Sequence, residues 1–492
     1  MKRFLALIIV LLLLSGTFAG VYSASVLDTA DKVEFEERIV YGDPSAAAGL
    51  HIRFFNEYSR EGYYLSHSYS RYLWTTDFSF DGGGYSAETM QGYVYGDPRK
   101  EIPERIEIHD GFGSGSKNYL IDWDLVKRIR EERAGELEEK GRVSIKLPAK
   151  TVFGFWPLDI SVMQKSSTYS QTVYNGGNLL SMAFDEYFRF DIDEDITVYL
   201  NVPKTGEPSA DFDYAEYGDR LIFGYGQSRY YGSLSYNGSL YFYLNFFKGE
   251  KLRDYSLVPG GYGIYKIDIP YTDGSLRADP ESIDTLYSFG EGIIVRELRG
   301  SAKGNVINAF VEENDAYVLY SIDAESGDLI QRLPVCGLLQ RNRMFVQQSG
   351  DCLVMGAVSD GTERNAALFV FKEDEKGIPS HELTADLGSV ADNETAKKLM
   401  AFGLMGKDSY RNYPKYYDFI YLYEDGRLYF ISADIPEEES SSPVYEPYNR
   451  CGISVVVCDE SGPLFFGSYE SSIGDRQCMP ATGYRPQIWL ER

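Results

Sequence analysis

The sequence predicts an all-β protein in which one hairpin pattern recurs along the C-terminal half. One observation is the composition, with 41 Tyr, 28 Phe and 48 Gly but only 4 Trp. Tyr and Phe suit pleated strands, and glycine suits the turns between them. The other observation is the stretch AYVLYSIDAESGDLIQRLPV at 316–335, which alternates like a strand, turns at an acidic segment containing glycine, and alternates again.

The same pattern occurs at other places in the chain. Strand-like segments that lead into an acidic turn with glycine start at Tyr265, Tyr320, Phe369 and Val456. Successive starts are 55, 49 and 87 residues apart. Propeller blades commonly run about 40–50 residues, so the first two spacings fit one blade each and the last fits two units of about 44. We therefore expect 417–435 to be an internal hairpin of a further unit, and VYLNVPKTGEPS from Val198 to be an earlier member.

This periodicity predicts a β-propeller-like fold of about six to eight blades, preferred over a β-sandwich or stacked β domains. Radial repetition leaves only short, protected sheet edges, which suits short strands joined by glycine turns. One helical insertion is expected at 121–140, where Trp123, Val126 and Ile129 recur at three-residue spacing on an otherwise charged segment. A second short helix is expected at 393–406.

The remaining segments complete the predicted order of elements. A loop is expected at 436–447, because PEEESSSPVYEP is polar and bounded by proline. We expect three regions, namely an N-terminal signal or anchor at 1–27, a β-rich region at 30–215 (first blades or a separate domain) and a propeller-like repeat region at 216–492. Further strands are expected at 50–58, 63–80, 142–149, 157–164, 186–206 and 219–226.

The N-terminus predicts export. Lys2 and Arg3 precede an unbroken apolar run from Phe4 to Leu14, and small residues follow, which is the plan of a secretory signal. No charge occurs from Phe4 until Asp28, so the segment also meets the length of about 20 residues that a membrane-spanning helix needs. It is either a cleaved signal or an uncleaved anchor, and in both cases the rest of the chain lies outside the cytoplasm. No Cys stands near residue 20, which excludes attachment as a lipoprotein.

The charge restricts the partners. A formal net charge of −26 repels phosphate backbones and anionic headgroups, so nucleic acid is excluded as a partner. We expect a protein, peptide or glycan ligand, and membrane contact only through an uncleaved N-terminal segment. Cationic ligands are compatible with this surface, although solubility alone also explains the charge.

The five cysteines all lie late in the chain. Cys451 and Cys458 flank a strand-like segment, and seven extended residues span about 23 Å, so they are not expected to bond to each other. Cys336 with Cys352 is the more plausible pair. No CxxC occurs, so redox and zinc chemistry have no support.

Several motifs imitate catalytic or metal sites. Three short motifs match those of penicillin-recognising serine enzymes: S-x-x-K at Ser114 to Lys117, S-x-N at 235–237 and KTG at 204–206. In that family KTG follows S-x-N, whereas here it precedes it, and Ser114 lies in a glycine-rich turn and not at the start of a helix. We therefore do not assign a catalytic serine. DIDED at 191–195 places aspartates at alternate positions, yet Ile196 replaces the glycine of a calcium loop, so we expect a polar turn between strands and keep a weak calcium site as the alternative. No HExxH, nucleophile elbow or P-loop occurs. Four histidines are present at scattered positions: His51, His67, His109 and His381.

Two partial resemblances bear on fold and location. LYSIDAESGDLIQRL at 319–333 resembles the repeat of quinoprotein-type propellers, which implies a propeller fold but not the enzyme activity, because Trp-rich docking motifs are absent and the four tryptophans are scattered. ERIVYGDPSAAAGLHI at 37–52, with the apolar segment before it, resembles an uncharacterised family of bacterial membrane-anchored proteins. That resemblance implies location and no chemistry.

These observations favour a binding or scaffolding protein over an enzyme, with no catalytic residue, cofactor or metal assigned. The alternatives are a carbohydrate-active hydrolase or lyase that uses a carboxylate pair in a propeller pocket, and a sensory ectodomain. Tyr-rich segments at 225–247 and 410–423 offer a binding platform, since Tyr presents a flat apolar ring with a polar tip. Structural packing is the preferred explanation of both, because alternate residues of such strands must also form the core.

Overall fold

A computed structural model of the full chain gives the fold. Within the described residues it is mostly antiparallel strand with few helices, as predicted. No helix in these segments has the length and apolarity needed to cross a membrane. The predicted helix at 393–406 and loop at 436–447 lie outside the described residues, as does all of 1–27 except 15–17. The structure describes residues 15–17, 34–58, 72–93, 105–110, 122–156, 158–165, 170–172, 179–193, 195–201, 220–223, 227–248, 251–272, 275–276, 278–337, 342–359, 366–390, 420–433, 452–471, 478–480 and 487–491.

The chain forms two compact units that divide it differently from the expected ranges. Unit 1 comprises Met1–Lys100 and Leu338–Arg492, and unit 2 comprises Glu101–Gly337. Unit 1 contains both ends of the chain because N-terminal strands pair with C-terminal ones. Strand β1 (Phe35–Gly42) pairs with β29 (Gly462–Ser471). Strand β2 (Leu50–Tyr58) pairs with β30 (Cys478–Pro480) and with β31 (Gln487–Leu490).

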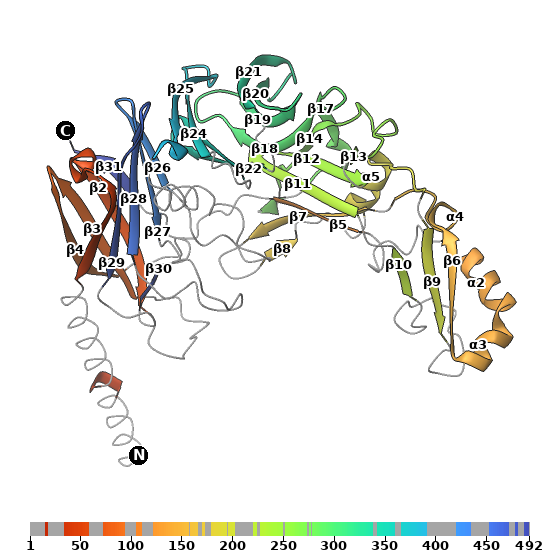
Figure 1. The fold of residues 1–492 in the computed structure, drawn as a ribbon. Helices are drawn as coiled ribbons and strands as arrows, with labels where there is room; N and C mark the ends of the chain where they lie inside the picture. Colours follow the sequence, from red (N-terminus) through yellow and green to blue (C-terminus); the bar gives the residue numbers. More distant parts are fainter. Residues whose placement is uncertain are drawn as a thin grey trace, which may run out of the picture. The chain divides into compact units, whose positions relative to one another are not determined.

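Three sheets make up the described part of unit 1 (Figure 1). The first is β22 (Asn342–Ser349), β23 (Cys352–Ser359), β24 (Ala366–Glu373) and β25 (Pro379–Asp386). The second is β26 (Ile420–Glu424), β27 (Arg427–Ala433), β28 (Gly452–Asp459) and β29, completed by β1. The third is β30 and β31 on one edge of β2, followed by β3 (Tyr72–Asp81) and β4 (Gly84–Tyr93).

The second sheet of unit 1 is buried on both faces. Val456 and Phe466 pack with Val370 of the first sheet, and the alternate residues Val455 and Val457 pack with the third sheet. A strand buried on both faces reads as a continuous apolar run, and SVVVC in β28 is such a run. The two cores therefore hold the three sheets of this unit face to face.

Unit 2 is built on two sheets packed together (Figure 1). The first is β11 (Gln227–Tyr236), β12 (Ser239–Lys248), β14 (Gly263–Asp268) and β17 (Asp284–Ser288). The second is β18 (Ile294–Gly300), β19 (Val306–Glu313), β20 (Ala316–Asp323) and β21 (Leu329–Gly337). The short strand β13 (Lys251–Leu252) pairs with β12 as a fifth strand of the first sheet. Strands β15 (Tyr271–Thr272) and β16 (Ser275–Leu276) form a two-stranded sheet of their own. A third sheet contains β5 (Arg105–Asp110), β7 (Leu158–Lys165) and β8 (Ser170–Thr172).

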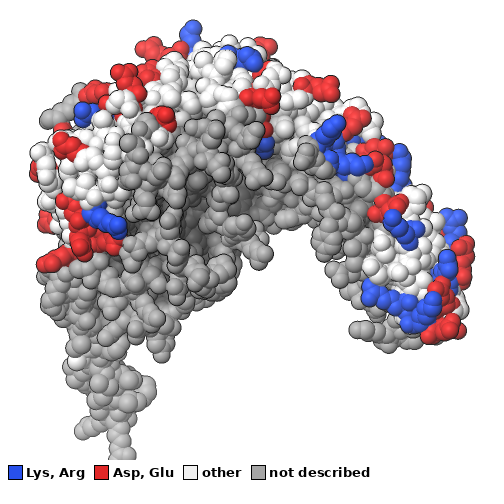
Figure 2. Space-filling view, viewed as in Figure 1, with Lys and Arg blue, Asp and Glu red and all other residues white. Residues whose placement is uncertain are grey.

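A small mixed part of unit 2 holds most of the helices. Its sheet is β6 (Arg142–Pro148), β9 (Asp195–Asn201) and β10 (Arg220–Phe223). The helix predicted at 121–140 is two helices, α2 (Trp123–Glu132) and α3 (Ala134–Lys140). The break falls at Arg133, whose N–H already bonds the carbonyls that end α2. The helix α4 (Ala149–Phe153) contacts β6, whereas α5 (Leu179–Tyr187) lies outside this part and contacts β7. Acidic and basic side chains alternate over α2 and α3 (Figure 2), which is the charged face that the sequence predicts.

The recurring pattern marks one position in four sheets. The strands β14, β20, β24 and β28 contain Tyr265, Tyr320, Phe369 and Val456. Each is the third of four strands that pair in chain order, and β13 and β1 add a fifth strand to the sheets of β14 and β28. The prediction of an additional unit in the 87-residue gap is wrong, because the hairpin within 417–435 is β26 and β27, the first two strands of the same sheet as β28.

The segment from Val198 is not a member of this series. Val198 lies in β9, which pairs with β6 and β10 in a three-stranded sheet, and β6 precedes it by about 50 residues of chain. The alternation of its side chains reflects burial of one face, with Val198 and Leu200 in the core. Any half-buried strand produces that alternation, so the pattern alone did not distinguish this sheet from the repeats.

Candidate functional site

The third sheet of unit 1 has one apolar face and one polar face. Along β2, Leu50, Ile52 and Phe54 are buried in the core, whereas His51 and Arg53 point to the other side and are half-buried. Side chains alternate because successive residues of a strand point to opposite faces. The polar face is defined here as His51, Arg53, Asp77, Glu88 and Trp489, which the strand register places on the same side of β2, β3, β4 and β31.

One row of the polar face is an ion-pair row. Arg53 stands opposite Asp77, and its Nε and Nη2 atoms donate to the two carboxylate oxygens at 2.8 and 2.7 Å. This two-point pairing raises the pKa of Arg53. Glu88 stands directly opposite Asp77 on the next strand and is exposed, and no described residue bonds to it. Cross-strand neighbours of this kind have Cβ atoms about 5 Å apart, so the two carboxylates repel each other.

The adjacent row carries the rings. His51 stands opposite Trp489 of β31, and the two rings stack with centroids 5.5 Å apart and planes inclined by 15°. The guanidinium carbon of Arg53 lies 5.9 Å from the centroid of the same indole ring. Nε2 of His51 lies 3.3 Å from a carboxylate oxygen of Glu491. Imidazole, indole and guanidinium groups thus form one contiguous surface.

Glycine at position 49 allows β31 to reach this sheet. Gly49 has a φ of +81°, and a Cβ there would lie 2.8 Å from the carbonyl oxygen of Glu491. Its N–H donates to Phe80 and its carbonyl accepts from Glu491, so the residue joins the edges of β3 and β31. Only glycine adopts this conformation and spacing without strain. Trp489 and Glu491 therefore depend on Gly49 for their positions.

This arrangement is suited to binding. Its aromatic and guanidinium groups are the side chains that interfaces enrich, and its carboxylates give it negative charge. No group of three or more metal-ligating side chains occurs among the described residues. Asp77 is already engaged by Arg53, which makes it a poor general acid or nucleophile.

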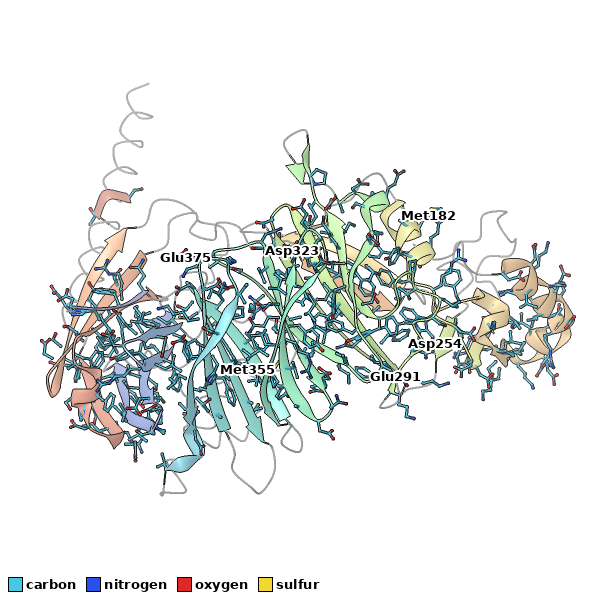
Figure 3. The ribbon with its side chains drawn as sticks, turned by 90° about the horizontal axis from the view of Figure 1, so that it is seen from above. Met182, Asp254, Glu291, Asp323, Met355 and Glu375 are labelled. Atoms are coloured by element: carbon cyan, nitrogen blue, oxygen red, sulfur yellow. The ribbon has the colours of Figure 1, made fainter. Side chains whose placement is uncertain are left out.

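The acidic turns of the repeats have a structural role. Asp323 accepts hydrogen bonds from the N–H groups of Glu325 and Ser326 at 2.9 and 2.8 Å. Asp374 accepts in the same way from Lys376 and Ile378 at 2.8 and 2.9 Å. These backbone donors stabilise the ionised form and lower the pKa of both aspartates. Figure 3 labels Asp323 and Glu375 at these turns, so the carboxylates that mark the pattern close turns.

The DIDED segment does not form a metal site in the structure. Each aspartate bonds a different lysine: Asp191 with Lys150 at 2.6 Å, Asp195 with Lys146 at 2.9 Å, and Asp193 with Lys248. Lys150 lowers the pKa of Asp191. The three carboxylates therefore diverge, and the predicted polar turn before β9 is the better description.

The other candidate motifs lie partly outside the described residues, and their described members have structural partners or lie in strands. Ser114, Lys117, 204–206 and His67 lie outside the described residues. SYN at 235–237 is the end of β11 and the turn after it, where Asn237 has a φ of +50° and its amide bonds Asn305 at 2.9 Å. His381 bonds Thr384 at 2.8 Å and packs on Phe371. His109 lies in β5, opposite Asp159.

The predicted pairing of Cys336 with Cys352 is wrong, because both are free thiols. Burial raises the pKa of each to about 11, which keeps them protonated at neutral pH. Cys458 is also free and fully buried, so the expectation that it does not bond Cys451 is confirmed.

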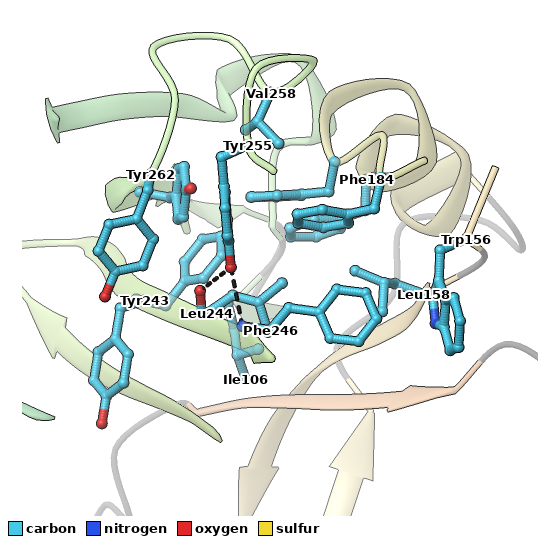
Figure 4. Close-up of a cluster of buried hydrophobic side chains, with 14 of the residues drawn as sticks. Ile106, Trp156, Leu158, Phe184, Tyr243, Leu244, Phe246, Tyr255, Val258 and Tyr262 are labelled. Carbon is cyan, nitrogen blue, oxygen red and sulfur yellow. Dashed lines mark hydrogen bonds between the residues drawn. The ribbon is translucent and has the colours of Figure 1, made fainter. Parts of the chain in front are cut away.

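The Tyr-rich segments serve packing in β12 and at Tyr421 of β26, whereas Tyr231 of β11 is exposed. Nine of the ten residues of β12 are buried, and Tyr421 of β26 is 1% exposed. Around β12, the Tyr255 hydroxyl accepts from the Phe246 N–H at 3.0 Å and donates to the Leu244 carbonyl (Figure 4). Residues 410–419 lie outside the described residues. The structural explanation of these tyrosines is therefore confirmed for β12 and β26.

Sequence reasoning did not identify the polar face. His51 was among the candidates, but Arg53, Asp77, Glu88 and Trp489 were not, because they lie on four strands drawn from both ends of the chain. The one available signal was the polar alternation in HIR and TDFS, and it says nothing about register.

Comparisons with known proteins give weak likenesses. No protein-family model matches the sequence, and no curated protein matches it. Among solved structures, a periplasmic gluconolactonase of Pseudomonas aeruginosa is 9% identical with a TM-score of 0.29, over 89% of this chain and 99% of that one. A putative 6-phosphogluconolactonase of Bacteroides fragilis is 11% identical with a TM-score of 0.26, over 88% and 98%. A protein of Lactobacillus plantarum is 10% identical with a TM-score of 0.29, over 87% and 99%. Likenesses at this level carry no conclusion about this chain.

Proposed function

We propose that this protein is a β-propeller-like binding or scaffolding module that acts outside the cytoplasm and binds its partner at the polar face. The observation that carries the binding function is the contiguous surface of imidazole, indole, guanidinium and carboxylate groups on β2, β3, β4 and β31. Such a surface supplies apolar area and directed polar contacts together, which recognition sites require.

The propeller part of the proposal rests on the repeats. Four consecutive up-and-down sheets share the position of the recurring pattern, and β1 completes the sheet that holds β26–β29. Completion of a C-terminal sheet by an N-terminal strand protects an edge and joins the two ends of the chain. In this proposal the blades are the three sheets of unit 1 and three sheets of unit 2, namely those of β11–β17, of β18–β21 and of β5, β7 and β8. The sheet of β6, β9 and β10 and the pair β15–β16 are not counted as blades, so the proposed number is six, within the expected range of about six to eight.

Small-angle X-ray scattering tests the propeller. A chain of this length folded into one closed body has a radius of gyration of about 23 Å. Two separately moving units give a clearly larger value and an extended distance distribution. The second result would remove the closed wheel while leaving each unit and its sheets unchanged.

The location is supported by the charged start and apolar run at 1–14. Alkaline phosphatase fused after Arg492 is active only when exported, so it should be active in this fusion. Fractionation then separates an anchored chain from a secreted one. An inactive phosphatase fusion, with an active fusion of a known exported protein beside it, would refute the location.

A carbohydrate-active hydrolase or lyase is the alternative, because Asp77 and Glu88 are neighbouring carboxylates on one face. We disfavour it because Arg53 engages both oxygens of Asp77. Screening on a polysaccharide panel tests the choice. A cleavage activity that is lost in both Asp77→Asn and Glu88→Gln would replace the binding proposal with the enzyme.

A further inference from the structure

We infer that the partner bound at the polar face is a basic peptide segment, which presents Lys or Arg side chains to Glu88 and Trp489. This inference rests on the proposed binding function of that face. It adds the chemical class of the partner, and it is argued from three features of the face.

The first feature is an internal example of the same recognition. The guanidinium carbon of Arg53 lies 5.9 Å from the Trp489 ring centroid, while its Nε and Nη2 atoms donate to Asp77. A cation over an indole ring is attracted by the negative ring face, and a carboxylate fixes its orientation. The face therefore already accommodates one guanidinium between a ring and a carboxylate.

The second feature is a carboxylate without a cation. Glu88 is exposed, stands directly across from Asp77 and has no bonded partner among the described residues. Like charges placed directly opposite on neighbouring strands are destabilising. A Lys or Arg side chain from a partner would relieve this repulsion, so the face gains more from a cation than from a neutral group.

The third feature is the charge balance. On or beside this face, Asp77 pairs with Arg53, Glu88 stands opposite Asp77, and Glu491 lies against His51. The named residues of the face thus bring three carboxylates and one guanidinium. The chain as a whole carries −26, which attracts cationic partners from a distance and repels acidic ones. A basic segment is complementary to both the local and the overall charge.

The experiment uses hexa-arginine peptide as the probe and hexa-glutamine as its neutral control. Binding is followed by isothermal titration calorimetry and by tryptophan fluorescence. The contribution of Trp489 is the fluorescence of the wild type minus that of the Trp489→Phe variant. We expect saturable binding of hexa-arginine that weakens with added salt and perturbs Trp489, and no binding of hexa-glutamine.

Variants separate this site from the general negative charge. Glu88→Gln should weaken hexa-arginine binding about three- to fivefold, the loss of one exposed charge pair. Glu139→Gln on α3 removes an equal charge from an exposed position outside the face and should change binding less than 1.5-fold, on the order of the experimental error. Arg53→Gln should strengthen binding, because Asp77 becomes free for the peptide, whereas Arg133→Gln should not.

The outcomes are distinguishable. Equal effects of Glu88→Gln and Glu139→Gln mean diffuse attraction and overturn the inference. Binding of neutral oligosaccharides at Trp489, without hexa-arginine binding, overturns the basic partner but keeps a binding function at this face. If neither peptides nor oligosaccharides of a broad panel perturb Trp489, the proposed function fails with it.

Discussion

The removal of one hydroxyl from Tyr262 should destabilise unit 2 strongly. β18 is an edge strand, and its Val295 is fully buried, so the backbone groups that point away from β19 need partners. The Tyr262 hydroxyl accepts from the Val295 N–H at 2.7 Å and donates to Oδ1 of Asn245 at 2.6 Å. Nδ2 of Asn245 donates to the Val295 carbonyl at 2.7 Å. Tyr262 and Asn245 thus complete the edge of β18 from the neighbouring sheet.

The magnitude follows from the groups left unpaired. Tyr262→Phe removes the partner of the Val295 N–H and of the Asn245 amide oxygen, and Asn245 is only 1% exposed. Each buried polar group without a partner costs about 1–3 kcal/mol. The two groups together should therefore cost about 2–6 kcal/mol. The melting temperature should fall by about 4–24 °C for a unit of this size.

Thermal melting and urea unfolding measure the global loss, and hydrogen exchange of the peptide that covers β18 measures the local one. Tyr231→Phe is the matched control, because Tyr231 lies on β11 with 37% of its surface exposed and should change stability by less than about 0.5 kcal/mol. If Tyr262→Phe melts with the control and β18 exchanges at the wild-type rate, the proposed role of this hydroxyl is refuted.

Three further outcomes are expected. Gly42→Ala should lower the free energy of unfolding by about 2 kcal/mol or more, because Gly42 has a φ of +79° and the new Cβ would collide with the Leu464 carbonyl. Gly141→Ala is the control: Gly141 has a φ of +71° but open space around it, so the cost should be about 1 kcal/mol. Equilibrium unfolding measures both. The pKa values of Asp323 and Asp374 are lowered in the folded protein, so the two carboxylates stabilise it above about pH 4 and this stabilisation is lost as the pH falls through their folded pKa values. The double variant Asp323→Asn, Asp374→Asn keeps the turns but has no carboxylates to protonate. Its free energy of unfolding should therefore decrease less than that of the wild type between about pH 5 and about pH 3. Cys458 is fully buried with its pKa raised by burial, so mass spectrometry should find it unalkylated until the protein unfolds; labelling in the native state would contradict the packing around it.

The repeat was predictable because its signal is local. A strand that alternates and ends in an acidic turn uses residues adjacent in sequence, and the turn closes through bonds such as Asp323 to Ser326. Hydrophobic alternation and turn chemistry are both readable at that range. The four starts accordingly identified the third strand of four sheets.

The spacing between repeats gave a wrong prediction where the length of the chain between two repeats did not correspond to the number of sheets. The interval from Phe369 to Val456 was taken as two units, yet β26 and β27 share a sheet with β28. The number of residues between two occurrences of a pattern does not show how the strands between them pair. Length therefore bounds the number of repeats from above, and strand pairing decides it.

The polar face was beyond sequence reasoning because it depends on long-range register. Trp489 meets His51 only when β31 pairs with β2 in one alignment, and a shift by one residue would turn the indole into the core. Gly49 fixes that alignment through a backbone conformation that a single sequence does not reveal. Pairings between chain ends separated by over 400 residues leave no local pattern.

The high acidic content of this chain is a poor guide to its site, because several of its carboxylates already have partners in the fold. Backbone N–H groups hold Asp323 and Asp374, and Lys150 holds Asp191. A carboxylate that closes a turn stabilises the fold and has little left to offer a ligand. Glu88 differs because the register of the sheet alone places it opposite Asp77, and no described residue bonds its side chain. The number of acidic residues therefore does not locate a binding site. The carboxylates whose side chains have no bonding partner in the fold are the ones that can bind a ligand.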